Sequence, residues 1–221
     1  MPQAIALAAA VAYALSFILS KRGLRYSTPI TITFVSLFMQ TLVLGGIAVT
    51  ITGVPSTTPF VFSLFIIAGV LQMVVRQLTY IGIEKIGAAR SGPIRASVPL
   101  WSAAVAIFFL GERITAPIAL GTALVVGGIL LISWRTDETV KDFRPWYVIA
   151  PLLAAILGGV VYPLRRYALK FSDDPIYFGA IVGVVGLLCT VLFLALPTTK
   201  DRLVWHRPSL GYFIVGGSLE S

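Results

Sequence analysis

The sequence predicts an all-α fold: a polytopic bundle of transmembrane helices arranged as a five-helix inverted repeat. Composition and the length of the apolar runs predict the helices, and an internal similarity predicts the repeat. Hydrophobic residues make up 57% of the 221-residue chain and charged residues 12%, with a mean hydropathy of +0.93. Ordinary soluble domains carry about 25% charged residues, and a soluble surface cannot be this apolar. A bilayer, which solvates an apolar outer surface, resolves that problem.

Apolar runs of about 20 residues recur along the chain, the length that a helix needs to cross the hydrocarbon core. They are too long for membrane β-strands, which need about 9–11 residues. Pro29, Pro59 and Pro175 are expected to open helices, because the N–H that proline lacks has no helical partner there. The predicted spans are 3–20, 29–51, 59–83, 91–111, 115–134, 146–164 and 175–196, with an eighth beginning near Ser209.

The first span is interpreted as a retained anchor. A secretory signal peptide begins with a positively charged region, and none precedes this apolar run, which is long enough to cross a bilayer. Lys21, Arg22 and Arg25 follow it instead. The expected location is therefore a cell membrane, inner or plasma, with multi-pass topology.

Two parts of the chain resemble each other. An offset of 145 residues places Phe17 on Tyr162, Lys21 on Arg166, Arg25 on Lys170 and Tyr26 on Phe171 without a gap. Later, an offset of 148 places Phe65, Ile66, Gly69 and Leu71 on Phe213, Ile214, Gly217 and Leu219. The polar link Arg135 to Arg144 separates the copies. The predicted domains are 1–135, a five-helix unit, and 146–221, which ends within the third helix of a second unit. An odd helix count inserts the second copy upside down, as in many carriers.

The segment from Ile83 to Trp134 combines features that are typical of one family. In order, these are the small residues Gly87, Ala88 and Ala89, then Pro99, then the helix end Leu110, Gly111 and Glu112, then Gly121, Gly127 and Gly128. With the opening YALSFILSKRGL (13–24) and the repeat, they resemble the EamA-like family of the drug/metabolite transporter superfamily. The resemblance implies ten helices in two inverted units, a central substrate path, and export or exchange of small metabolites. The sequence departs from that pattern at its end, because helix eight only begins.

Arg76 is the sharpest local feature. It lies deep in the third span, and spacings of three and four place Gly69, Met73 and Tyr80 on its face. An arginine at a helix centre costs about 2.5–3.5 kcal/mol on insertion scales, so it should face protein or a water-filled cavity. Arg76 is therefore a candidate anion-binding or gating charge, with Tyr80 beside it. The alternative is a guanidinium that caps carbonyls or snorkels to the interface.

Arg95 is a second candidate for binding an acidic substrate group. It lies near Pro93 and Pro99, and prolines free carbonyls at broken helices that line cavities in carriers. Ser102 shares its face. A snorkelling interfacial position is the slightly favoured alternative for Arg95. Lys21 is a weaker candidate for a cavity mouth, because a cation at a helix C-terminus is already favoured by the helix dipole.

Other polar and small residues in the spans are interpreted as packing groups. The GxxxG pair Gly179 and Gly183 allows helices to approach closely. Glu112 is expected to hold a turn. The polar side chains Gln40, Thr41, Thr79 and Ser97 are expected to bond to neighbours.

Several kinds of chemistry find no support. No acid falls in the middle of a complete span, although Glu220 could lie within the unfinished eighth, so a carboxylate proton relay is not predicted. The single cysteine, Cys189, supports neither a disulfide nor zinc chemistry, and no phosphate-binding loop is present. We therefore predict no catalytic residues, metal or cofactor, and no nucleic acid, since the basic residues lie between spans. Expected partners are a small-molecule substrate and membrane lipids, and assembly with a second copy into a homodimer is left open.

Three alternative functions stay open: a flippase for lipids or lipid-linked substrates, a non-transporting assembly subunit, and a membrane enzyme using Asp173 and Asp174. Orientation is also open. Most Lys and Arg residues follow the odd-numbered spans, which puts the N-terminus outside. The family resemblance suggests the opposite.

Overall fold

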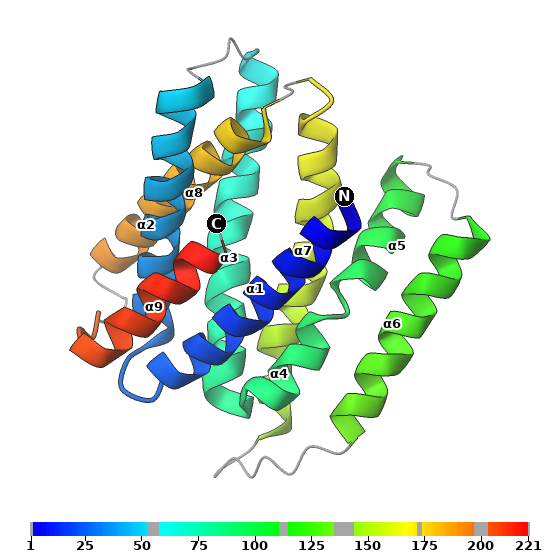
Figure 1. Ribbon diagram of the computed structural model, residues 1–221, viewed down its shortest axis with the longest axis horizontal. Coiled ribbons are helices and arrows are strands. Elements are labelled where there is room, and N and C mark those ends of the chain that lie inside the picture. The colour runs from blue at the N-terminus through cyan, green and yellow to red at the C-terminus, as the bar shows by residue number, and fades with distance from the viewer. Residues whose placement is uncertain are drawn as a thin grey trace.

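The computed structural model describes residues 2–52, 58–110, 115–134, 144–171, 174–196 and 203–220. Within these ranges all regular structure is helical, which confirms the all-α prediction (Figure 1). The α-helices are α1 (Pro2–Gly23), α2 (Pro29–Ile47), α3 (Pro59–Ile86), α4 (Ala88–Arg95), α5 (Val98–Leu110), α6 (Ala116–Trp134), α7 (Ile149–Ala168), α8 (Pro175–Ala195) and α9 (Arg207–Leu219). A π-helical turn, Ala48–Thr52, extends α2, and a 3₁₀ turn, Pro145–Val148, precedes α7.

Four helical stretches of the described chain are long and apolar enough to cross a bilayer. They are Pro29–Ile51, Pro59–Ile86, Pro145–Ala168 and Pro175–Ala195. Their exposed side chains are largely apolar: Leu42 on α2 is 59% exposed and Leu192 on α8 is 66% exposed. Serine and threonine side chains such as Ser16 and Thr190 are fully buried. An apolar outside over a partly polar inside identifies an integral membrane protein.

The predicted helix starts are confirmed. Pro29, Pro59 and Pro175 are the first residues of α2, α3 and α8. Asp174 caps α8, because its carboxylate accepts hydrogen bonds from the N–H groups of Ile176 at 2.9 Å and Tyr177 at 3.0 Å. Glu112, Asp173 and most of the link Arg135 to Arg144 lie outside the described residues.

The prediction of one continuous span over 91–111 is wrong. The structure has two helices there, α4 and α5, which are separated at Ala96 and Ser97. Pro99 explains the break: it cannot donate to the carbonyl of Arg95 four residues earlier, and its ring would clash with that carbonyl. The first helix therefore ends at Arg95. The turn before it, between α3 and α4, uses Gly87 at φ 82°, which favours glycine.

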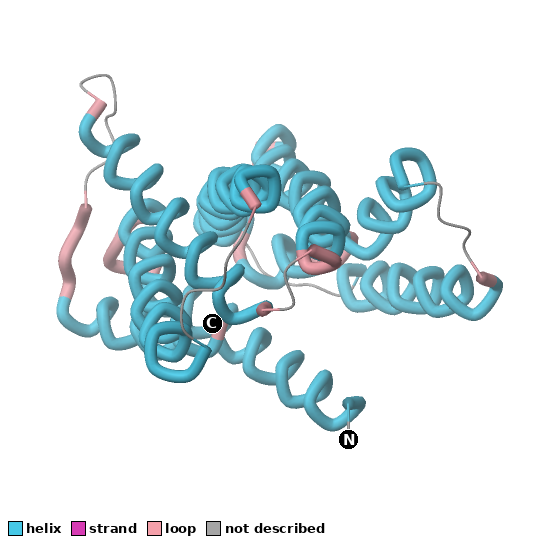
Figure 2. Tube along the Cα trace, turned by 90° about the horizontal axis from the view of Figure 1, so that it is seen from above, coloured by secondary structure: helices cyan, strands magenta, loops and turns pink. Residues whose placement is uncertain are grey.

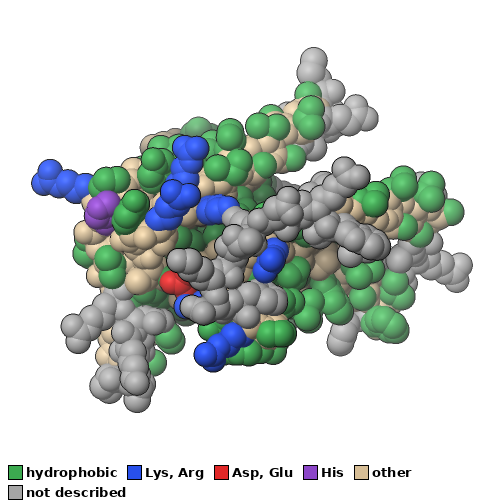
Figure 3. Space-filling view, turned by 90° about the horizontal axis from the view of Figure 1, so that it is seen from below, with side chains coloured by type: hydrophobic (Ala, Val, Ile, Leu, Met, Phe, Trp, Pro, Cys, Tyr) green, Lys and Arg blue, Asp and Glu red, His purple; other side chains and the backbone are tan. Residues whose placement is uncertain are grey.

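The helices pack against one another as a bundle. Extensive contacts join α3 to α7 and α8, α2 to α8, and α1 to α9, while α5 packs on α7 (Figure 1). Helix α6 packs against α4 and α5, and α5 and α6 stand at one side of the bundle in both ribbon views (Figure 2). The face seen in Figure 3 gathers Lys and Arg side chains between apolar flanks, as expected for a surface near phospholipid headgroups.

Glycines make the closest helix contacts. A Cβ added at Gly179 would lie 2.6 Å from Leu44 Cδ1, and one at Gly183 would lie 2.9 Å from Thr41 Oγ1, so the predicted GxxxG face packs on α2. On α3, a Cβ at Gly69 would lie 2.6 Å from Val185 Cβ on α8. Such contacts allow the backbones to approach where no hydrophobic force acts between helices in lipid.

The substitution Gly69→Ala is expected to destabilise the bundle. The new methyl group meets the Cβ of Val185 rather than the end of a flexible side chain, so α3 and α8 must separate. Overpacking of this kind costs about 1–3 kcal/mol. The matched control is Gly45→Ala on α2, where the added Cβ meets nothing within 4 Å. Tryptophan-fluorescence melting in detergent should show a lower Tm for Gly69→Ala alone, and equal melting of both variants would contradict this packing.

Candidate functional site

A cavity of about 230 Å³ lies inside the bundle, lined by residues of α1, α2, α3, α4, α7 and α8 and by Glu220 at the end of α9. Its lining is unusually polar for the interior of a membrane protein. The charged and amide side chains on it are Arg76, Arg95, Arg165, Glu220, Gln40 and Gln72. Ionisable groups away from the interface are rare in membrane proteins and mark substrate or ion pathways.

Arg76 is held from the neighbouring helix α2. The residue is 7% exposed, and its Nη2 donates a hydrogen bond of 2.6 Å to Oε1 of Gln40. The amide of Gln40 is itself fixed, because its Nε2 donates to the carbonyl of Gly179 at 2.9 Å. The other terminal nitrogen, Nη1, lies 3.6 Å from Oε2 of Glu220 and has no hydrogen-bond partner among the described residues.

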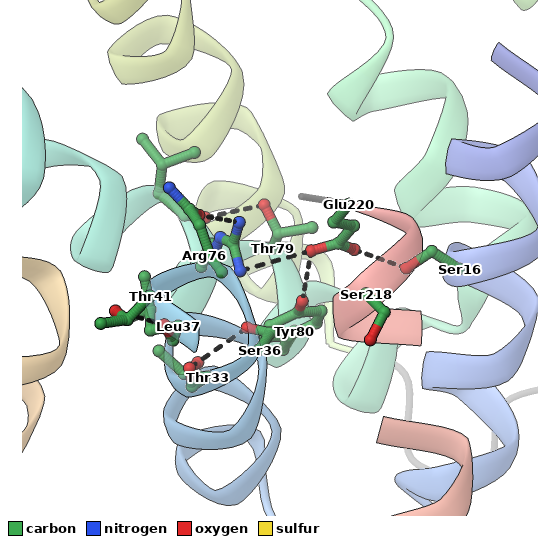
Figure 4. A network of polar contacts seen from close by, with 12 residues as sticks. Ser16, Thr33, Ser36, Leu37, Thr41, Arg76, Thr79, Tyr80, Ser218 and Glu220 are labelled. Atoms are coloured by element: carbon green, nitrogen blue, oxygen red, sulfur yellow. Dashed lines mark hydrogen bonds and ion pairs between the residues drawn. The ribbon is translucent and has the colours of Figure 1, made fainter. Parts of the chain in front are cut away.

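Glu220 connects three helices at the cavity. The Tyr80 hydroxyl donates to its Oε2 at 3.0 Å, and the Ser16 hydroxyl donates to its Oε1 at 2.7 Å (Figure 4). Its side chain is 11% exposed. Ser16 belongs to α1, Tyr80 to α3 and Glu220 follows α9, so this carboxylate joins α9 to α1 and α3.

Arg95 reaches the same cavity from the end of α4. Its Nε donates to Oγ1 of Thr79 at 3.2 Å, and Thr79 donates in turn to the carbonyl of Val75 at 2.7 Å. The guanidinium lies over Gly158 of α7, where an added Cβ would be 2.9 Å from Nη1. Arg95 therefore lines the cavity and is half-buried, and the interfacial alternative stays a prediction. The helix break at Pro99 lets this side chain turn inward.

A wider cavity of about 860 Å³ adjoins the first. It lies between α1, α4, α5 and α7, and its lining is largely apolar. The two cavities share Tyr13, Phe17, Arg95 and Tyr162. Arg95 thus stands where a polar chamber meets an apolar one.

The sequence of the first part of the chain matches a known family model. The model is that of the EamA-like transporter family, and it covers residues 2–134. The chain belongs to the EamA-like transporter family. Membership makes the protein a membrane transport protein rather than an enzyme.

Eleven chains of solved structures also match this EamA-like protein. One, known from a crystal structure, has a TM-score of 0.55 and 15% sequence identity, and the match covers 96% of this chain and 79% of that chain. At this identity the likeness shows the fold alone. No protein in a search of curated sequences matched significantly.

The predicted site residues of this EamA-like protein divide into three groups. Arg76, Tyr80 and Arg95 lie together on the polar cavity. Ser102 lines the apolar cavity, beside Arg95. Lys21, near the end of α1, lines neither of these two cavities.

Sequence reasoning missed the residues that hold the arginines in place. Gln40 and Thr79 were interpreted as packing groups able to bond to a neighbour, and the sequence did not indicate that these neighbours are Arg76 and Arg95. Gln72 could have been found, because it lies one helical turn before Arg76 on the same face. The role of Glu220 had only a weak signal, an acid directly after an apolar run. Tyr13 and Tyr162 had none.

A double-mutant cycle with Arg76→Gln and Glu220→Gln is expected to show coupling. Contacting charges in a poorly hydrated site couple by about 0.5–3 kcal/mol. The control is the exposed pair Lys85 and Glu84, with Nζ and Oε2 3.1 Å apart, for which Lys85→Gln and Glu84→Gln should couple by about 0–1 kcal/mol. Thermal melting of the four variants and two doubles in detergent measures both values. A coupling at Arg76–Glu220 no larger than the control would show that this ion pair does not hold the site.

Proposed function

We propose that this protein works as an EamA-like secondary carrier that exports or exchanges small metabolites, with the polar cavity as its substrate site. The observation that carries the proposal is a cavity lined by buried, hydrogen-bonded charges inside a bundle whose outside is apolar. Its volume of about 230 Å³ lies below the range of about 300–1,000 Å³ typical for drug-sized ligands. The substrate is accordingly a small molecule.

The proposal includes an inverted repeat, with α1, α2 and α3 equivalent to α7, α8 and α9. A two-fold relation between such units requires that contacts occur in exchanged pairs. The contact of α3 with α7 has its counterpart in that of α1 with α9, and α2 packs on its own equivalent, α8. This pattern supports two interlocked copies with the cavity between them.

Individual residues follow the same exchange. Gly69 on α3 packs on Val185 of α8, and the equivalent Gly217 on α9 packs on α2, where an added Cβ would lie 2.9 Å from Ser36 Cα. Phe65 is buried in a cluster with Ala168, while the equivalent Phe213 packs on Gly23, the position that the offset of 145 aligns with Ala168.

Two pairs of positions that the sequence offsets relate to each other both line the polar cavity. Gln72 and Glu220 are related by the offset of 148, and both line the cavity. Phe17 and Tyr162, related by the offset of 145, also both line it. Paired positions of the two proposed units on one cavity support the arrangement that is expected when a carrier rocks one unit against the other.

A lipid flippase is the second candidate, because the apolar cavity of about 860 Å³ adjoins the polar one. A phospholipid could place its headgroup near Arg95 and its chains in the apolar space. The two functions differ in what crosses the bilayer. Proteoliposomes therefore need two readouts: flux of water-soluble metabolites, and loss of fluorescence from labelled phospholipid exposed to dithionite.

The substitution Gly158→Leu is expected to abolish metabolite flux in proteoliposomes. The added side chain would occupy the place of the Arg95 guanidinium and fill the cavity. Gly211→Leu on α9, where an added Cβ meets nothing within 4 Å, is the matched control and should retain flux. Gly158→Ala, which displaces only the flexible end of Arg95, should reduce flux while preserving Tm. Undiminished flux in folded Gly158→Leu protein would contradict a transport path through this cavity. If the unsubstituted protein accelerates lipid scrambling but gives no metabolite flux, the protein is a flippase and not a metabolite carrier.

A further inference from the structure

The charges on the polar cavity do not balance. The described lining carries three arginines, Arg76, Arg95 and Arg165, against one carboxylate, Glu220. Arg165 is exposed, with its guanidinium 5.6 Å from the centre of the Phe178 ring. Such an excess of positive charge on a cavity inside a protein attracts and concentrates anions.

Arg76 has unused binding capacity at this place. Of its two terminal nitrogens, Nη2 is occupied by Gln40, whereas Nη1 is buried and lacks a hydrogen-bond acceptor among the described residues. A buried charged donor without an acceptor is costly, and native proteins seldom leave one without a reason. An oxyanion in the cavity would supply the missing acceptor.

In the empty protein, the carboxylate of Glu220 supplies the negative charge next to Arg76 that such an oxyanion would supply. Its Oε2 lies 3.6 Å from Nη1 of Arg76, within ion-pair range but outside hydrogen-bond range. Its carboxylate is held instead by the hydroxyls of Tyr80 and Ser16. An incoming anion could therefore take over Arg76 while Glu220 keeps both of its hydrogen bonds.

Arg95 supplies a second guanidinium from the end of α4. It is linked to α3 through Thr79, which lies one turn after Arg76, and its guanidinium lies over a glycine rather than a side chain. Two fixed guanidinium groups on one small cavity suit carboxylate or phosphate oxygens, which accept paired N–H donors.

We propose that the substrate is a small organic anion, bound through its carboxylate or phosphate oxygens by Arg76 and Arg95, with Glu220 as the internal counter-ion that it displaces. This inference rests on the proposed carrier function and names the class of molecule that the carrier takes. Glu220 then sets affinity: it stabilises Arg76 in the empty protein and competes with the substrate.

The test uses matched pairs of small molecules that differ in charge: lactate and lactamide, succinate and succinamide, and glycerol 3-phosphate and glycerol, with choline as a cation. Binding to the full chain in neutral detergent is measured by calorimetry, and flux is measured in proteoliposomes. At least one anion should bind at least about tenfold more tightly than its neutral partner, as expected for a charge-assisted pairing.

Variants separate the role of Arg76, which binds the anion, from that of Glu220, which competes with it. Arg76→Gln should abolish the preference for the anion. Arg76→Lys keeps the positive charge but not the paired N–H donors of the guanidinium, and it should retain part of that preference. Glu220→Gln should tighten anion binding severalfold, because the competing charge is lost while both hydroxyl bonds can still form. Glu84→Gln, at the exposed end of α3, is the control and should leave binding unchanged.

The outcomes distinguish this inference from the carrier function. Flux of lactamide, glycerol or choline, with no flux of lactate, succinate or glycerol 3-phosphate, would overturn the anion site and leave the carrier function standing. Anion binding without flux of any compound would overturn the carrier and leave the site. Weaker anion binding in Glu220→Gln would refute Glu220 as a competitor. Binding of phosphatidylglycerol vesicles with no binding of the free anions would assign the oxyanion to a lipid headgroup and overturn the proposal.

Discussion

A charged arginine in the middle of a membrane helix is the constraint on which this structure depends. Placing Arg76 in lipid would cost about 2.5–3.5 kcal/mol on insertion scales and more on an isolated helix. The bundle avoids that cost by surrounding Arg76 with Gln40 of α2 and with Glu220 after α9. These partners lie far apart in the sequence, so Arg76 links α3 to α2 and to the residue that follows α9.

Two backbone features make room for the site. Proline at position 99 ends α4 at Arg95, and the side chain of Arg95 bonds to Thr79 of α3. Gly158 on α7 leaves room for the Arg95 guanidinium, and Gly179 on α8 lets α2 pack closely against α8. The polar chamber and the wider apolar one meet at Arg95, so a substrate moving between them would pass this guanidinium.

The sequence predicted the helices and the central arginine well, because apolar run length and an isolated charge are local signals. Proline positions fixed the starts of α2, α3 and α8. The break in the span 91–111 was missed, although both of its prolines are visible, since an isolated proline can kink a helix without ending it. The partners of the arginines could not be predicted. Gln40 bonds to Arg76 across 36 positions and Tyr80 bonds to Glu220 across 140, and no periodicity within one helix encodes such pairings.

The central claim is that the bundle encloses a water-accessible cavity with positive potential. The most direct test places a single thiol there, by Gln72→Cys in a Cys189→Ser background, and compares an anionic with a cationic methanethiosulfonate reagent. The account predicts reaction at position 72, with a rate ratio shifted toward the anionic reagent relative to a free thiol, and loss of that shift with Arg76→Gln. Leu192→Cys, on the exposed apolar side of α8, should not react. A thiol at position 72 that is unreactive, or that prefers the cationic reagent, would contradict the account.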